Sequence, residues 1–296
     1  MTSSLHVAGR DSRRIDLHAH STASDGTLTP DELVVAAAQA NLDVVAITDH
    51  DTVAGWSAAA AALPPGLTLI PGAELSCRWY GARPAIPLHL LAYLFDPDAP
   101  DLAAEMARVR VSRETRAERI VERLRADGID IDWTEVYASA AGGTVGRPHI
   151  AQALVRAGVV QTIAQAFAPE WLGERYRLPK DDTDVFLAVR LVREAGGVPV
   201  FAHPRASRRG RIVPDSLIAE LAAVGLAGLE ADHEDHSPEE RARVRALAAE
   251  LGLLVTGSSD FHGTNKTVRL GAHTTSPADF ERLVEEAKGV APITAA

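Results

Sequence analysis

Two pairs of side chains in this sequence have the types and the spacing of metal ligands. His18 and His20 are separated by one residue, and so are Asp260 and His262. Alternate side chains of a β-strand point to the same face, so each pair can bind one metal ion from one side of a sheet. The two pairs therefore predict a metal site that is built from imidazole and carboxylate groups.

Further residues of the same two types lie in or at the end of apolar runs: His50, Glu74, His89 and His203. Asp25 follows His20 after a short loop. Each is weak evidence alone, because a lone buried histidine such as His89 is more often a hydrogen-bonded core residue than a ligand. Together the nine side chains are stronger evidence, since most follow the carboxyl ends of predicted strands, where parallel barrels form their active sites. Imidazole and carboxylate without thiolate favour Mn, Fe or Zn over a structural zinc finger.

The elements that must position these side chains alternate between strands and helices. Thr29-Pro30-Asp31-Glu32 and Ser237-Pro238-Glu239-Glu240 each predict a helix start with a capping box and a proline in the first turn. Helical patterns of this kind separate many of the short apolar runs: 15–20, 44–50, 67–74, 88–95, 198–203, 226–230 and 253–260. This alternation is typical of an α/β fold with parallel strands.

Residues 98–184 have a different pattern, with long helical segments (102–126 and 150–157) and no convincing buried strand. We interpret them as a mostly helical insert that covers the active site. The chain then divides into a first barrel part (14–97), this insert (98–184) and a second barrel part (185–296).

The composition limits the class of protein. Of 296 residues 46% are hydrophobic, which is enough for one large domain or a domain with an insert. A formal net charge of −10 argues against a stable nucleic-acid complex, because phosphate backbones bind basic surfaces. The chain has a single cysteine, Cys77, and neither a signal-like N-terminus nor a membrane-length apolar run, so we expect a cytoplasmic protein.

The sequence resembles the PHP (polymerase and histidinol phosphatase) superfamily over nearly its whole length. The matching segments are His18-Ala19-His20 with Asp25, Thr48-Asp49-His50, Glu74, His203-Pro204 and Ser259-Asp260-Phe261-His262-Gly263. The resemblance implies a distorted (β/α)7 barrel with a site for three divalent metal ions. By the family pattern, the first ion is held by His18, His20, Glu74 and Asp260, the second by Glu74, His89 and His203, and the third by Asp25, His50 and His262.

The resemblance also implies a phosphoesterase. Some branches of the family have histidine where this chain has Asp25, which favours the branch that acts on nucleotides, including removal of the 3′-phosphate from nucleoside 3′,5′-bisphosphates. Trimming of short oligonucleotides is compatible with the same site. The alternatives are a histidinol-phosphate phosphatase and a non-catalytic metal-binding module. We hypothesise that a hydroxide bridging the metals, near Asp260, Glu74 and His203, attacks phosphorus, within a centre whose net charge is about +2.

Three residues of the predicted insert are candidates for substrate binding. Arg147, in Gly146-Arg147-Pro148-His149, precedes a helix whose free amide groups favour an anion, and in the family this motif, which includes His149, helps to bind the substrate phosphate. Lys180 is a candidate for a second phosphate contact. The arginines of 108–125 alternate with glutamates at helical spacing, which predicts a solvated helix face outside the site.

Overall fold

The computed structural model describes residues 13–140, 143 and 145–295. Seven strands follow one another across one sheet: β1 (Ile15–Asp16), β2 (Val44–Ile47), β3 (Thr68–Trp79), β4 (Ile86–Tyr93), β6 (Val198–Phe201), β7 (Gly228–Asp232) and β8 (Leu254–Gly257). Two short strands, β5 (Thr183–Asp184) and β9 (Ile293–Thr294), pair with β3 outside this path. None of the helices formed by the described residues is both long and apolar enough to span a membrane.

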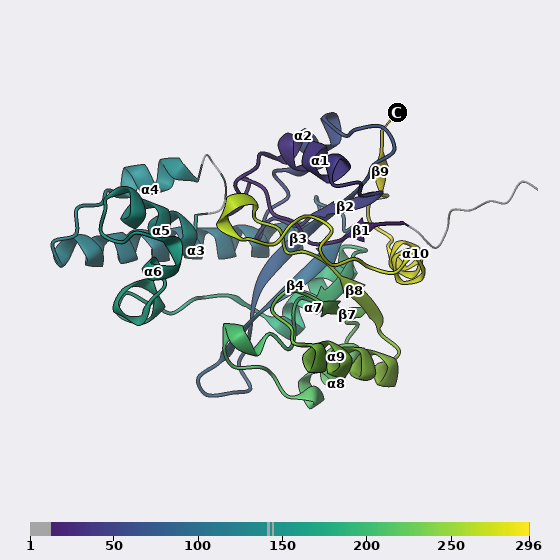
Figure 1. The fold of residues 1–296 in the computed structure, drawn as a ribbon. Coiled ribbons are helices and arrows are strands. Elements are labelled where there is room, and N and C mark those ends of the chain that lie inside the picture. The colour runs from purple at the N-terminus through teal and green to yellow at the C-terminus, as the bar shows by residue number, and fades with distance from the viewer. Residues whose placement is uncertain (1–12, 141–142, 144, 296) are drawn as a thin grey trace, which may run out of the picture.

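The sheet curves until its two end strands meet (Figure 1). The segments that follow β1 and β8 are joined by a parallel bridge between Ala19 and Phe261. In this bridge the His20 amide donates to the Phe261 carbonyl (2.8 Å), and the Phe261 amide donates to the His18 carbonyl (3.3 Å). The predicted α/β fold with a barrel-like sheet is therefore confirmed, and the bridge brings both pairs of predicted ligands together.

Strand β4 differs from the expectation of parallel strands, because it is antiparallel to both of its neighbours, β3 and β6. Only residues 80–85 separate β3 from β4. A connection this short forms a hairpin, whereas a crossover between parallel strands needs about a dozen residues. The reversal places His89, near the beginning of β4, opposite Ser76 of β3 and on the same side of the barrel as the ends of the parallel strands.

Six helices surround the sheet in Figure 1: α1 (Pro30–Gln39), α2 (Trp56–Ala61), α7 (Val185–Glu194), α8 (Asp215–Ala223), α9 (Pro238–Leu251) and α10 (Pro277–Glu286). The predicted capping boxes begin α1 and α9, with reciprocal bonds between Thr29 and Glu32 and between Ser237 and Glu240. Two 3-10 turns, η2 (Ser207–Arg209) and η3 (Gly263–Asn265), lie in the loops after β6 and β8.

The remaining helices gather at one side of the barrel (Figure 1): α3 (Pro100–Ala126), α4 (Trp133–Ser139), α5 (Arg147–Arg156), α6 (Ile163–Ala166) and the π-helical turn η1 (Pro169–Gly173). Helix α3 joins both parts of the molecule. Its first turns contribute Leu102 and Met106 to the barrel core, whereas Ile120 and Leu124 belong to a separate hydrophobic cluster with α4, α5 and η1. Burial of both ends of α3 fixes the position of the side chains in its middle.

Candidate active site

Four donor atoms from separate segments meet at the end of the barrel. The Nε2 atoms of His18 and His20 are 3.1 Å apart. Glu74 Oε2 lies 3.3 Å from His18 Nε2 and 3.2 Å from His20 Nε2, and Asp260 Oδ1 lies 3.4 Å from each of these nitrogens. Four ligands placed tetrahedrally at about 2.1 Å from one ion would be roughly 3.4 Å apart. The four atoms therefore fit a single metal ion.

The hydrogen bond at the other ring nitrogen of His18 supports this fit. His18 Nδ1 lies 3.0 Å from Glu230 Oε1, and because a carboxylate only accepts, Nδ1 carries the proton. The lone pair of Nε2 is then directed at the other three donor atoms. Glu230 is itself fixed by the Ser258 hydroxyl (2.6 Å) and the His203 amide (2.8 Å). A carboxylate behind a histidine ligand is a common device for holding the ring in the binding orientation.

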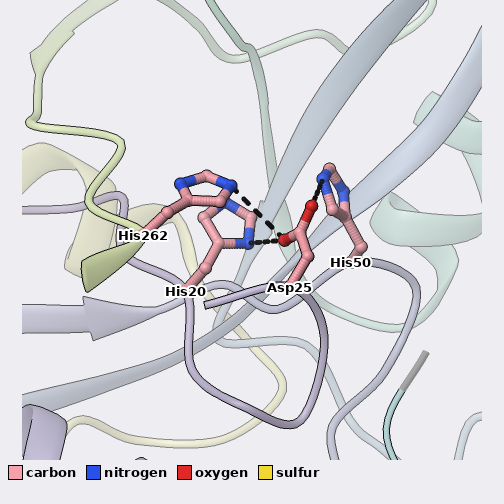
Figure 2. Close-up of side chains that lie close together, drawn as sticks. All are labelled: His20, Asp25, His50 and His262. Carbon is pink, nitrogen blue, oxygen red and sulfur yellow. Dashed lines mark ion pairs between the residues drawn. The ribbon is translucent and has the colours of Figure 1, made fainter. Parts of the chain in front are cut away.

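A second group of donors surrounds the carboxylate of Asp25, as Figure 2 shows. Its Oδ1 lies 3.3 Å from His262 Nε2 and 3.7 Å from His20 Nδ1, and its Oδ2 lies 3.7 Å from His50 Nε2. The Nδ1 of His262 is 2.9 Å from the Asp260 carbonyl, to which it donates, so its Nε2 lone pair faces Asp25. These four residues fit a metal ion on the outer side of His20.

Glu74 also reaches a third group with its other oxygen. Its Oε1 lies 2.8 Å from His89 Nδ1 and 3.2 Å from His203 Nε2. The contact with His89 does not have hydrogen-bond geometry, although that nitrogen is buried. The second oxygen of Glu74 and the nearby nitrogens of His89 and His203 would therefore suit a further cation.

The two oxygens of Asp260 have different surroundings. Oδ1 faces the histidines of the first group, whereas Oδ2 accepts from Arg209 Nη2 (2.6 Å), Lys266 Nζ (2.6 Å) and His233 Nε2 (3.1 Å). The tautomer of His233 is set by the Asp235 amide, which donates to His233 Nδ1 (3.0 Å) and leaves the proton on Nε2. Asp260 is thus held with one oxygen free for a metal ion.

The ionisation of these residues reflects their mutual proximity. Burial disfavours a charged imidazole at His18, but the carboxylates of Glu74, Asp260 and Glu230 outweigh it and raise the pKa of His18 well above its ordinary value. For His20 burial is again opposed, by Asp260 and Glu74, and its pKa rises to about 9. Without metal, protons therefore occupy sites that a divalent ion would take, so metal binding must release them.

A pocket of about 520 Å³ opens beside His89 and His203. Its basic lining residues come from three parts of the chain: Arg147, Arg177, Lys180, Arg209 and Arg211. The lining also includes apolar side chains, among them Ile86, Leu88 and Val213. The described residues that line it include no carboxylate. In a protein with a net charge of −10, this pocket concentrates positive charge where an anionic substrate would meet the predicted metal site.

The middle of helix α3 is buried, although the sequence predicts a solvated face there. Arg113 and Arg116 are each only 8% exposed. Arg113 Nη1 donates to Ser76 Oγ (2.6 Å) and to Asp51 Oδ2 (3.1 Å), and so ties α3 to the barrel next to Glu74. The prediction of a solvated helix face is therefore wrong for Arg113 and Arg116, which are buried in the middle of α3.

Eight of the nine predicted ligands lie in three overlapping groups of possible metal donors, of which the third is His50, Glu74 and His89. The ninth, His203, lies outside these groups but is 3.2 Å from Glu74 Oε1, and Arg147 and Lys180 line the pocket. His149 is not part of the pocket lining: its Nδ1 accepts from the Gly146 amide (3.1 Å), which caps α5. Sequence reasoning missed Glu230, Arg209 and Lys266, which contact predicted ligands from loops and a strand end. For Glu230 the sequence offers one signal, its place at the end of the predicted strand 226–230.

Comparison with known proteins agrees with this geometry. The family model of the PHP domain matches residues 16–126. A 5′-3′ exoribonuclease of Haemophilus influenzae is 35% identical over 263 residues, which cover 88% of this chain and 93% of the relative. A 3′,5′-nucleoside bisphosphate phosphatase of Chromobacterium violaceum is 32% identical over 274 residues, covering 88% and 91%. The solved structure of a protein described as a metal-dependent phosphoesterase, from Bifidobacterium adolescentis, has a TM-score of 0.87 and 36% identity, and the match covers 95% of this chain and 98% of that one.

Proposed function

This chain belongs to the PHP family of metal-dependent phosphoesterases, and from that membership we propose that it removes the 3′-phosphate of a nucleoside 3′,5′-bisphosphate. It is a hydrolase of phosphoester bonds, as the names of its relatives indicate. The same site is compatible with 5′-3′ trimming of short oligonucleotides, which the exoribonuclease relative supports. The cytoplasmic location stays a prediction from the sequence.

The three donor groups are the proposed places of three divalent ions, with Glu74 shared between two of them. Nitrogen and oxygen donors of this kind suit Mn, and also Fe or Zn. Bound ions would act as Lewis acids toward a phosphoryl oxygen and would lower the pKa of coordinated water. The chain's own contribution is to fix the donors: Glu230 orients His18, and His233, Arg209 and Lys266 orient Asp260.

The observation that carries the proposed substrate is the charge of the pocket. Five basic side chains line it, and three of them, Arg147, Arg177 and Lys180, come from the predicted insert. A substrate with one phosphate at the metal groups and another in this pocket would place negative charge at both ends. A nucleoside 3′,5′-bisphosphate has this arrangement, and the apolar side chains of the lining offer a surface for its base.

The same observation weighs against histidinol phosphate, the alternative substrate. That compound carries an ammonium group, and the described lining of the pocket holds no carboxylate to pair with it. The other alternative, a non-catalytic module, is disfavoured by the complete set of donors and by the cationic pocket beside them, which metal storage alone would not require.

A phosphate-release assay with Mn²⁺ tests the proposal. The substrates would be adenosine 3′,5′-bisphosphate, 3′-AMP, 5′-AMP, a 5′-phosphorylated dinucleotide and histidinol phosphate. We expect the highest kcat/KM for the bisphosphate and no release after exhaustive chelation of the metal. A clear preference for histidinol phosphate would replace the proposed substrate, and no release from any monoester would favour the non-catalytic alternative.

A further inference from the structure

Asn265 lies where three segments of the chain meet, in the 3-10 turn η3 that follows His262. Its side-chain nitrogen donates to the Asp25 carbonyl (2.9 Å), and its backbone amide donates to the His262 carbonyl (3.4 Å). Its side-chain oxygen accepts from Gln152 Nε2 of α5 (3.4 Å). One half-buried residue thus bonds the backbone of two proposed metal ligands and a side chain of the helical insert.

The donors around Asp25 are more widely spaced than those around His18. We call the four residues of Figure 2 the Asp25 group: His20, Asp25, His50 and His262. The Asp25 oxygens lie 3.3 to 3.7 Å from the histidine nitrogens of this group, whereas the donors proposed for the first ion are 3.1 to 3.4 Å apart. A small shift of the loops that carry Asp25 and His262 would therefore move these donors out of the range that one ion can span.

Hydrogen bonds to Asp49 hold the loop before Asp25, but they do not reach the Asp25 backbone. Asp49 accepts from the Ser21 amide (2.8 Å), the Ser21 hydroxyl (2.6 Å) and the Ser24 hydroxyl (2.6 Å). Among the described residues, only Asn265 donates a hydrogen bond to the Asp25 carbonyl. Asn265 therefore fixes the part of this loop that carries the proposed ligand.

The insert contacts the loops of the Asp25 group at two places. One is the hydrogen bond from Gln152 to Asn265. The other is Gly143, which packs directly on the loop before Asp25: a side-chain carbon added to it would lie 2.5 Å from the Thr22 carbonyl oxygen. In Figure 1 the turn η3 accordingly lies between the barrel and the helices of the insert. The insert is therefore seated against the proposed ion site as well as beside the pocket.

We propose that Asn265 is a positioning residue for the ion of the Asp25 group, and that the insert helps to hold this ion through Gln152. The inference rests on the proposed three-ion site. Asn265 keeps the backbones of Asp25 and His262 at their present separation, and the bond from Gln152 restrains the Asn265 side chain. Groups behind metal ligands typically contribute 10- to 100-fold to metal affinity. The ion of the Asp25 group should therefore be the one that is most sensitive to the contact with the insert.

The test is calorimetric titration of the metal-free protein with Mn²⁺, for wild type and Asn265→Ala. Wild type should bind three ions, and in the variant one of them should bind about 10- to 100-fold more weakly while the other two are unchanged. The metal-free variant should unfold at nearly the same temperature as wild type, because Asn265 is half-buried in a loop. The Mn²⁺ concentration for half-maximal phosphate release should rise by the same factor, with kcat restored at saturating Mn²⁺.

Asn265→Asp separates the lost hydrogen bond from general damage to the loop. The carboxylate has nearly the same shape and still accepts from Gln152, but it cannot donate to the Asp25 carbonyl. Its negative charge would by itself favour a cation, so weaker binding of the same ion isolates the lost donor. Gln152→Ala should weaken this ion by roughly two- to tenfold, as expected for one neutral hydrogen bond. The matched control is Gln161→Ala, an exposed glutamine of the insert, which should bind all ions as wild type does.

The titration decides the inference whether or not any phosphate is released, so the inference and the proposed reaction can fail separately. Unchanged affinity for every ion in Asn265→Ala would overturn the inference, and so would an equal loss at all three ions or tighter binding in Asn265→Asp. If wild type bound fewer than three ions, the three-ion site itself would be wrong, and the inference with it.

Discussion

The donor groups at the barrel end and the basic pocket beside them differ in the sign of their charge. In the first, imidazoles and carboxylates face one another at 3.1 to 3.4 Å, around places that fit positive ions. In the second, guanidinium and ammonium groups line a pocket whose described lining holds no carboxylate, so it fits an anion. Changes in the donor groups should therefore act mainly on kcat, and changes in the basic pocket mainly on KM.

The largest effect is expected for Glu74→Gln, because both oxygens of Glu74 face predicted ions. We expect loss of bound metal and a fall in kcat/KM of at least about a thousandfold, or roughly 4 kcal/mol. Metal analysis of the purified variant and the phosphate-release assay check this, with the exposed Glu118→Gln as the control. If Glu74→Gln kept its full metal content and full activity, Glu74 would not have the proposed bridging role.

A smaller effect is expected for the histidine that orients Asp260. His233→Gln can still donate to Asp260 through its amide nitrogen, whereas His233→Asn is too short but can still accept from the Asp235 amide. Loss of a residue that hydrogen-bonds a metal ligand typically lowers metal affinity 10- to 100-fold. We therefore expect such a loss for His233→Asn and near wild-type affinity for His233→Gln. Calorimetric titration with Mn²⁺ measures both. Equal affinities for the two variants would mean that the bond to Asp260 does not orient it.

The smallest effect is a dependence on pH that comes from Lys180 of the pocket lining. Burial, with the charges of Arg113, Arg116 and Arg147, lowers the pKa of Lys180 to about 8, so Lys180 is charged below that pH and neutral above it. The substrate phosphate is already fully ionised there, since its second pKa is about 6. The KM for the bisphosphate, relative to that for 3′-AMP, should rise severalfold between pH 7 and pH 9. Lys180→Arg should flatten the profile, and a wild-type ratio that is independent of pH would contradict this assignment.

The two regions also differ in how far the sequence predicts them. The donor groups were predictable because His18, His20, Asp260 and His262 follow short apolar runs, and the ends of neighbouring strands meet in a barrel. The antiparallel direction of β4 was not, because hydrophobic pattern does not encode strand direction. Only the short length of the connection, residues 80–85, indicates that β3 and β4 are antiparallel.

The burial of Arg113 and Arg116 could not be predicted from the pattern of α3. Arg113, Arg116 and Arg119 look alike in the sequence, as members of one arginine- and glutamate-rich helix. Only the packing of α3 against both the barrel and the second hydrophobic cluster decides that the first two are buried and the third is exposed. Arg209 and Lys266 escaped prediction for a related reason, since loop conformation alone brings them to Asp260.

The long strand β3 fixes the distances between side chains that follow one another along one of its faces. Glu74, Ser76 and Arg78 occupy alternate positions of one strand and so share a face. The first lies among the proposed ligands, the second accepts from Arg113 and the third pairs with Asp182, which also lies near Lys180 of the pocket lining. Over these four steps the backbone advances roughly 13 Å. Because one strand carries all three side chains, its backbone fixes the distance between the proposed ligands and this basic region.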